Sequence, residues 1–211
     1  MGKSEIIHQI KEQKLVAVIR GNTVQEAIDI IRGAVLGGIK VIELTYTTPF
    51  VEDVFKAVRE EQALVGAGTV LDSETARHAI LNGAKFIVSP SFNDSIAKTC
   101  NRYTVPYFPG CMTIKEMVTA LEAGCDVLKL FPADQFNPSF IRSVKGPLPQ
   151  VELMPTGGIN ADNMKEWLKS GAVAVGIGSD LTRAYQAGGI DAVTTAAQVY
   201  LEKLEKLREE V

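Results

Sequence analysis

The sequence has few of the residues that metal sites and disulfide scaffolds require. Only two histidines occur in 211 residues, which disfavours a histidine-rich catalytic metal site. The three cysteines are odd in number and form no C-x-x-C pair, so neither a disulfide framework nor a structural zinc site is expected. We expect Cys100, Cys111 and Cys125 to be small buried residues in a reduced protein.

The sequence also lacks a long apolar run and an excess of basic residues. No run approaches the roughly 18 residues of a membrane span. The first residues do not have the basic-then-apolar layout of a secretory signal. Lys and Arg total 22 against 25 Asp and Glu, and this net charge of −3 gives no bulk attraction to nucleic acid or anionic membrane. We therefore expect a cytoplasmic protein with neither of these partners.

A short apolar run recurs along the whole chain. The runs start at residues 16, 41, 64, 86, 105, 127, 151 and 172. Each is rich in β-branched residues and is followed by turn-forming residues, a pattern typical of a buried strand. The segments between them have helical patterns. The clearest of these helices are predicted at Gln25–Leu36, Glu74–Leu81, Ile114–Ala123 and Ile190–Leu207.

Eight strand–helix units predict a closed (β/α)8 TIM barrel, an α/β fold, with an open doubly wound sheet as the alternative. The units occupy nearly the full length of the chain. We therefore expect residues 1–211 to form a single compact barrel domain, with an extra helix before the first strand.

In this barrel, catalytic groups lie at the C-terminal ends of the strands, on side chains that point inward. Side chains alternate between the two faces along a strand. In Val127–Phe131 the two leucines suit the layer beneath the helices, so Lys129 is predicted to point inward. The same alternation turns Glu43 and Arg20 toward the interior.

An inward lysine can form an imine with a carbonyl substrate, and a nearby carboxylate can move protons to and from that substrate. The alternative for Lys129 and Glu43 is an ion pair that only fills the barrel. Arg20 has a guanidinium whose fork matches a substrate carboxylate, although a surface salt bridge is its alternative.

Two glycine-rich loops follow the last two predicted strands, at Pro155–Ile159 and Gly176–Ser179. Their backbone N–H groups can bind an anion, and these loops are a frequent phosphate site in barrels. Tight turns without a ligand are the alternative. A third loop, Gly66–Thr69, offers the Thr69 hydroxyl beside closely approaching backbone.

Several segments occur in the order found in one known family. They are Val18–Arg20, Ile42–Thr45, Gly66–Val70, Ser89–Pro90, Pro109–Gly110, Leu128–Ala133 and Pro155–Ile159. On these segments the chain resembles, over nearly its whole length, the bacterial 2-keto-3-deoxy-6-phosphogluconate (KDPG) / 4-hydroxy-2-oxoglutarate (KHG) aldolases.

The resemblance implies a class I aldolase on a small barrel, usually a homotrimer, that acts on an oxo-acid without a metal or other cofactor. Lys129 would be the Schiff-base residue and Glu43 the proton acceptor and donor. The implied substrate-binding residues are Arg20, Thr69, Pro90, Phe131, Gly157, Gly158, Gly178 and Ser179.

The chain departs from one pattern of the family. Some members have an arginine four residues after the glutamate of the second strand, where this chain has Thr47. Others have an arginine at the end of the first strand, so the substrate carboxylate is assigned to Arg20. The residues leave open a sugar-phosphate epimerase, a Mg-dependent lyase and a non-catalytic protein that binds phosphorylated metabolites. They also leave open the aldehyde product and the configuration at C4.

Overall fold

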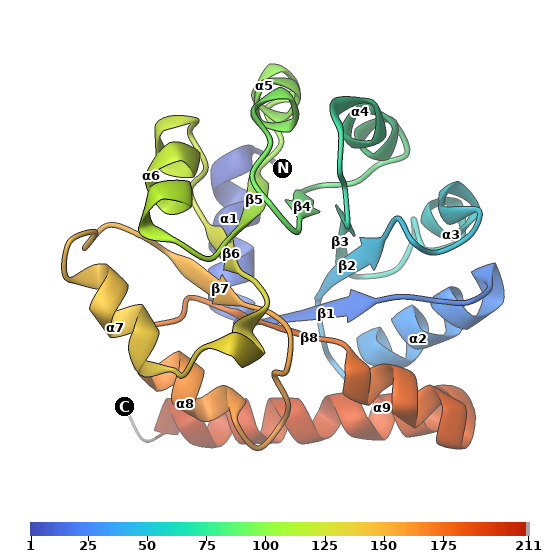
Figure 1. Cartoon of the computed structure of the whole chain (residues 1–211). Helices are drawn as coiled ribbons and strands as arrows, with labels where there is room; N and C mark the ends of the chain where they lie inside the picture. Colours follow the sequence, from blue (N-terminus) through green and yellow to red (C-terminus); the bar gives the residue numbers. More distant parts are fainter. Residues whose placement is uncertain (210–211) are drawn as a thin grey trace.

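The computed structural model describes residues 1–209 and has eight strands alternating with helices around a barrel (Figure 1). Residues 210 and 211 of the predicted domain lie outside the described residues. The strands are β1 (Leu15–Ile19), β2 (Val41–Thr45), β3 (Leu64–Gly68), β4 (Ile87–Ser89), β5 (Tyr107–Cys111), β6 (Leu128–Leu130), β7 (Leu153–Pro155) and β8 (Val175–Ile177). The helices are α1 (Lys3–Gln13), α2 (Val24–Leu36), α3 (Val51–Ala57), α4 (Ser73–Leu81), α5 (Asp94–Tyr103), α6 (Ile114–Glu122), α7 (Ser139–Lys145), α8 (Met164–Lys169) and α9 (Ser179–Glu209), with a 3-10 helix η1 (Ala133–Gln135).

The strands follow one another around the barrel in sequence order, and each pairs in parallel with its neighbours. The first and last strands also pair, with Val16 opposite Gly176. A bridge between Thr156 and Gly176 joins the end of β7 to β8. The closed-barrel prediction is therefore confirmed, and the open sheet is wrong. In the described part of the chain, no helix has the length and apolarity needed to cross a membrane.

Alternation along the strands sorts the buried side chains into two layers. Ile42, Leu44, Leu128 and Leu130 belong to the cluster between strands and helices. A separate cluster fills the barrel interior, and α1 contributes to it. The interior residues include Val16, Val41, Leu64, Phe86, Val88, Phe108, Val127 and Met154, with Ile6, Ile7 and Ile10 of α1. The predicted extra N-terminal helix is thus present, and its apolar face packs against the interior residues.

Three strands begin two or three residues later than their apolar runs predict. The runs start at 105, 151 and 172, whereas β5, β7 and β8 begin at Tyr107, Leu153 and Val175. In each case the first residue of the run closes the preceding turn instead of pairing in the sheet. The N–H groups of Val105, Val151 and Ala172 donate to Cys100, Leu148 and Trp167, respectively.

The last helix differs most from its prediction, Ile190–Leu207. Helix α9 begins at Ser179 and is interrupted by non-helical geometry at Gly188 and Gly189. Of its first nine residues only Leu181 is buried, so no apolar stripe marks this part as a helix.

The cysteines are buried and free, as predicted. Burial raises the pKa of the thiols of Cys100, Cys111 and Cys125 to about 12. These thiols are therefore unreactive near neutral pH.

Candidate active site

A cavity of about 610 Å³ lies at the C-terminal ends of the strands. In a TIM barrel this is the end where active sites are built. All ten residues predicted from the sequence line this one cavity: Arg20, Glu43, Thr69, Pro90, Lys129, Phe131, Gly157, Gly158, Gly178 and Ser179.

Lys129 and Glu43 meet inside the barrel. The Nζ of Lys129 on β6 lies 3.3 Å from Oε1 of Glu43 on β2, and the two side chains are 6% and 1% exposed. The ring of Phe131 adds a further contact, with Nζ 5.0 Å from its centroid. The amine therefore lies at the floor of the cavity between a carboxylate and an aromatic ring.

The second carboxylate oxygen of Glu43, Oε2, is buried and has no hydrogen-bond partner among the described residues. A buried carboxylate oxygen without a partner is costly, and it is suited to accept a hydrogen bond from a substrate hydroxyl or a water. The pair is thus arranged with one oxygen toward the amine and the other available for proton transfer.

Glycines in neighbouring strands make room for two polar side chains of the cavity, Glu43 and Thr156. A Cβ at Gly68 of β3 would lie 2.1 Å from Oε1 of Glu43. A Cβ at Gly176 of β8 would lie 2.4 Å from Oγ1 of Thr156. Both distances are far below van der Waals contact, so only glycine fits at either position without displacing the polar side chain.

The loops after β1 and β3 hold two further predicted residues, Arg20 and Thr69. Thr69 follows β3 in a left-handed conformation, with φ 57°. Arg20 follows β1 and is exposed at the cavity. The N–H of Gly21 donates to Oγ1 of Thr48 at 3.2 Å, which ties the loop that carries Arg20 to the loop after β2. Thr47 is hydrogen-bonded to Thr45 and is not among the lining residues.

The glycine-rich loops after β7 and β8 have the geometry of an anion site. Gly157 and Gly158 adopt φ values of 95° and 74°. After β8, the carbonyl of Gly178 accepts the N–H groups of Leu181 and Thr182. The N–H groups of Ser179 and Asp180 therefore precede the first backbone hydrogen bonds of α9. The positive end of the helix dipole faces the cavity.

Other lining residues were not singled out from the sequence as site residues. They are Val18, Asn22, Thr45, Thr156, Ile159, Gly176, Ile177, Thr182, Arg183 and Gln186. Alternation along β2 turns Thr45 inward together with Glu43, and this pattern could have identified it. Arg183 and Gln186 lie in the polar first part of α9, which carries no hydrophobic pattern.

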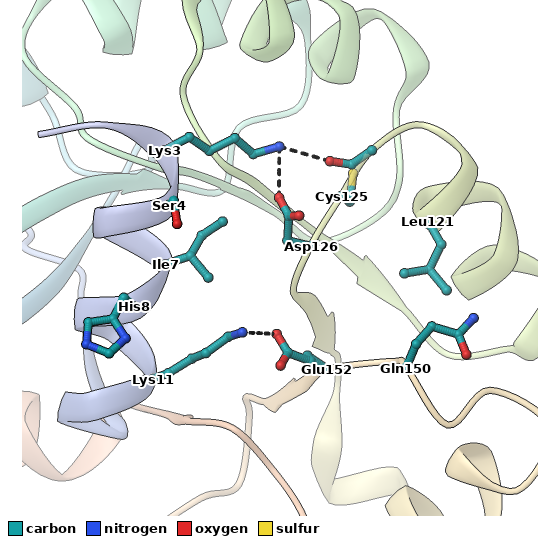
Figure 2. Close-up of a pocket in the computed structure, with 11 residues that line it drawn as sticks. Lys3, Ser4, Ile7, His8, Lys11, Leu121, Cys125, Asp126, Gln150 and Glu152 are labelled. Atoms are coloured by element: carbon teal, nitrogen blue, oxygen red, sulfur yellow. Dashed lines mark hydrogen bonds and ion pairs between the residues drawn. The ribbon is translucent and has the colours of Figure 1, made fainter.

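A second cavity, of about 820 Å³, lies at the opposite end of the barrel, between α1 and the segments that precede β6 and β7 (Figure 2). Two ion pairs cross it: Lys3 with Asp126 at 2.8 Å, and Lys11 with Glu152 at 2.5 Å. Residues at this end of a barrel serve stability. Within residues 1–209, no cluster of three or more His, Cys, Asp and Glu side chains is arranged to hold a metal ion.

Two curated proteins that are similar to this chain are aldolases. A 2-dehydro-3-deoxy-6-phosphogalactonate aldolase of Escherichia coli K12 is 34% identical over 176 residues, covering 82% of this chain and 86% of the relative. A 2-dehydro-3-deoxy-phosphogluconate aldolase of Treponema pallidum strain Nichols is 34% identical over 202 residues, covering 93% and 96%.

One solved structure is the KDPG aldolase of Legionella pneumophila with pyruvate captured as a covalent carbinolamine intermediate. It is 25% identical with a TM-score of 0.77, covering 89% of this chain and 93% of that one. The family model for KDPG and KHG aldolase matches residues 6–196. With its barrel and this family match, the chain belongs to the KDPG and KHG aldolase family.

Proposed function

We propose that this protein is a class I aldolase that reversibly cleaves a 4-hydroxy-2-oxo acid into pyruvate and an aldehyde. The observation that carries the proposal is the buried Lys129–Glu43 pair at the floor of the cavity. The substrates are KDPG, which yields glyceraldehyde 3-phosphate, and 4-hydroxy-2-oxoglutarate, which yields glyoxylate. Family membership supports this chemistry, since the Legionella relative was captured with pyruvate bound covalently.

The reaction begins at Lys129. Its neutral amine adds to the C2 carbonyl, and loss of water gives a protonated imine that withdraws electrons from C3. Glu43, directly or through a water, removes the proton of the C4 hydroxyl, and the C3–C4 bond breaks. The aldehyde leaves, Glu43 returns a proton to C3 of the enamine, and hydrolysis releases pyruvate and the free amine.

The two ends of the substrate are bound in different parts of the cavity. Arg20 pairs with the C1 carboxylate through its planar fork, and Thr69 holds the pyruvate portion. Pro90 and Phe131 form the walls beside the imine. The phosphate binds to backbone N–H groups of the two glycine-rich loops. The residues that form this phosphate site are Gly157, Gly158, Gly178 and Ser179.

Imine chemistry on Lys129 provides the electron sink, so the mechanism uses neither a metal nor an organic cofactor. Residues 1–211 act as one catalytic barrel domain. From the resemblance of the sequence to the family, we further propose that the enzyme is a cytoplasmic homotrimer.

Reductive trapping tests the proposal. The protein is incubated with pyruvate, treated with borohydride and digested, and the peptides are mapped by mass spectrometry. We expect a reduced pyruvyl adduct on Lys129 and none in the Lys129→Met variant. An adduct elsewhere, or none, contradicts the mechanism. A sugar-phosphate epimerase or a Mg-dependent lyase would give no adduct. The Mg-dependent lyase would also lose its activity in EDTA.

A further inference from the structure

The first part of α9 presents a polar face to the cavity. Ser179, Thr182, Arg183 and Gln186 line it, and their spacing of three, four and seven residues places them on one side of the helix. This helical segment follows directly on the glycine-rich loop after β8. Its side chains therefore extend the anion site beyond the backbone N–H groups of that loop.

An ion pair with Asp180 orients the side chain of Arg183. Its Nη2 donates to Oδ1 of Asp180, one turn earlier in the same helix. Asp180 is in turn fixed by Tyr200, whose hydroxyl donates to Oδ2 at 2.5 Å and whose side chain belongs to the buried core. A guanidinium has five N–H donors in one plane, so this bond at Nη2 leaves donors on the rest of the fork.

The ion pair contributes little to the stability of the fold. The side chain of Arg183 is 69% exposed, and exposed pairs typically contribute about 0–1 kcal/mol. Its effect is on orientation: Asp180 restricts the guanidinium to the rim of the cavity, where it lies among the lining residues.

The charged residues that line this cavity are Arg20, Glu43, Lys129 and Arg183. In the proposed reaction the first three act on the C1 carboxylate, the C4 hydroxyl and the C2 carbonyl. Arg183 has no partner in the pyruvate half of the substrate. We propose that Arg183 is a specificity-determining residue that binds the distal phosphate, and this inference rests on the proposed function.

The two substrates differ in the length and charge of the group that would reach Arg183. The distal carboxylate of 4-hydroxy-2-oxoglutarate is C5 itself, next to the cleaved bond. In KDPG the phosphorus lies three bonds beyond C5 and carries nearly two negative charges. A rim guanidinium beside the N-terminus of α9 suits the longer and more highly charged group. Arg183 thus favours the phosphorylated substrate.

The test compares Arg183→Gln with the unmodified enzyme on both substrates. A hydrogen bond to a charged group contributes enough that we expect kcat/KM for KDPG to fall about 10-fold to 100-fold, mainly through KM. For 4-hydroxy-2-oxoglutarate we expect a change of less than about threefold. Arg102→Gln, which removes an exposed arginine from the last turn of α5, is the charge-matched control and should change neither.

Two further measurements separate the possible failures. Borohydride trapping of pyruvate on Lys129 should be equal in Arg183→Gln and the unmodified enzyme; absence of trapping in both would defeat the proposed function itself. Inorganic phosphate should inhibit KDPG cleavage less in the variant. If trapping is intact and Arg183→Gln cleaves KDPG normally, or loses equally on both substrates, the inference about Arg183 is wrong.

Discussion

The side chain of Glu43 on β2 reaches diagonally to Gly68 on β3, two residues beyond its strand partner Gly66, and the absence of a side chain at 68 provides the space that the carboxylate occupies. A Cβ at that position would lie 2.1 Å from Oε1 of Glu43. A glycine on one strand therefore determines where the side chain proposed to transfer protons can lie on the next.

The first prediction follows from this contact. In Gly68→Ala, the carboxylate of Glu43 must leave its present position, and a displacement of about 1 Å typically costs about 100-fold in rate. We expect kcat to fall by about that factor, measured in a coupled assay for pyruvate. Gly146→Ala, at the end of α7, is the control, because its nearest neighbour would be a carbonyl at 3.3 Å. A fully active Gly68→Ala enzyme would show that this close packing is not needed.

Replacing the carboxylate of Glu43 tests proton transfer directly. Glu43→Gln keeps the shape of the side chain but cannot accept a proton. We expect kcat for cleavage, and exchange of the pyruvate methyl protons with solvent, to fall about 10²-fold to 10⁴-fold. Borohydride trapping on Lys129 should persist. Glu60→Gln, at an exposed position, should behave as the unmodified enzyme. If the methyl protons of pyruvate exchange at the normal rate in Glu43→Gln, a group other than Glu43 transfers the proton at C3.

Helix α1 permits a comparison of packing with ion pairing. Ile10 is 1% exposed within the interior cluster, so Ile10→Ala should lower the free energy of unfolding by about 2–5 kcal/mol. Lys11→Ala removes a pair with Glu152 whose side chains are 34% and 30% exposed, and should cost about 0–1 kcal/mol. Urea unfolding at low and high salt measures both. If Lys11→Ala lowered the free energy of unfolding more than Ile10→Ala, ion pairing and not apolar packing would be the main interaction that holds α1 on the barrel.

The N-cap of α4 makes stability depend on pH. Asp72 accepts the N–H of Thr75 at 2.6 Å, and this bond lowers the pKa of its carboxyl below 3.8. The charged form is thus favoured in the folded state. Its contribution is present above pH 3.8 and is lost as pH falls through the lower folded value.

Asp72→Ala should therefore lower the free energy of unfolding by about 0.5–2 kcal/mol at pH 7. The difference from the unmodified protein should shrink as the pH falls below 3.8. Asp72→Asn retains a capping oxygen and should lose much less at pH 7. Urea titrations across this range measure the difference, and one that is constant with pH would mean that the carboxylate charge contributes nothing.

Alternation along the strands was enough to predict that Lys129 and Glu43 face the interior, because a barrel strand has only two faces and leucines mark the outer one. The recurring runs likewise predicted the fold. The starts of β5, β7 and β8 were missed because apolar residues such as Val105 can close a helix turn instead of entering the sheet. Arg183 was missed because the first part of α9 has one buried residue, Leu181, and therefore no hydrophobic period.

The break at Gly188 and Gly189 divides α9 into two parts with different constraints. The second part packs on the core through Val193, Ala197 and Leu204, whereas the first part has Leu181 as its buried residue. We therefore expect changes at Thr182, Arg183 or Gln186 to alter this end of the cavity with little cost in folding free energy. We therefore expect substitutions in this segment to change substrate preference while the fold is retained, in laboratory evolution or in nature.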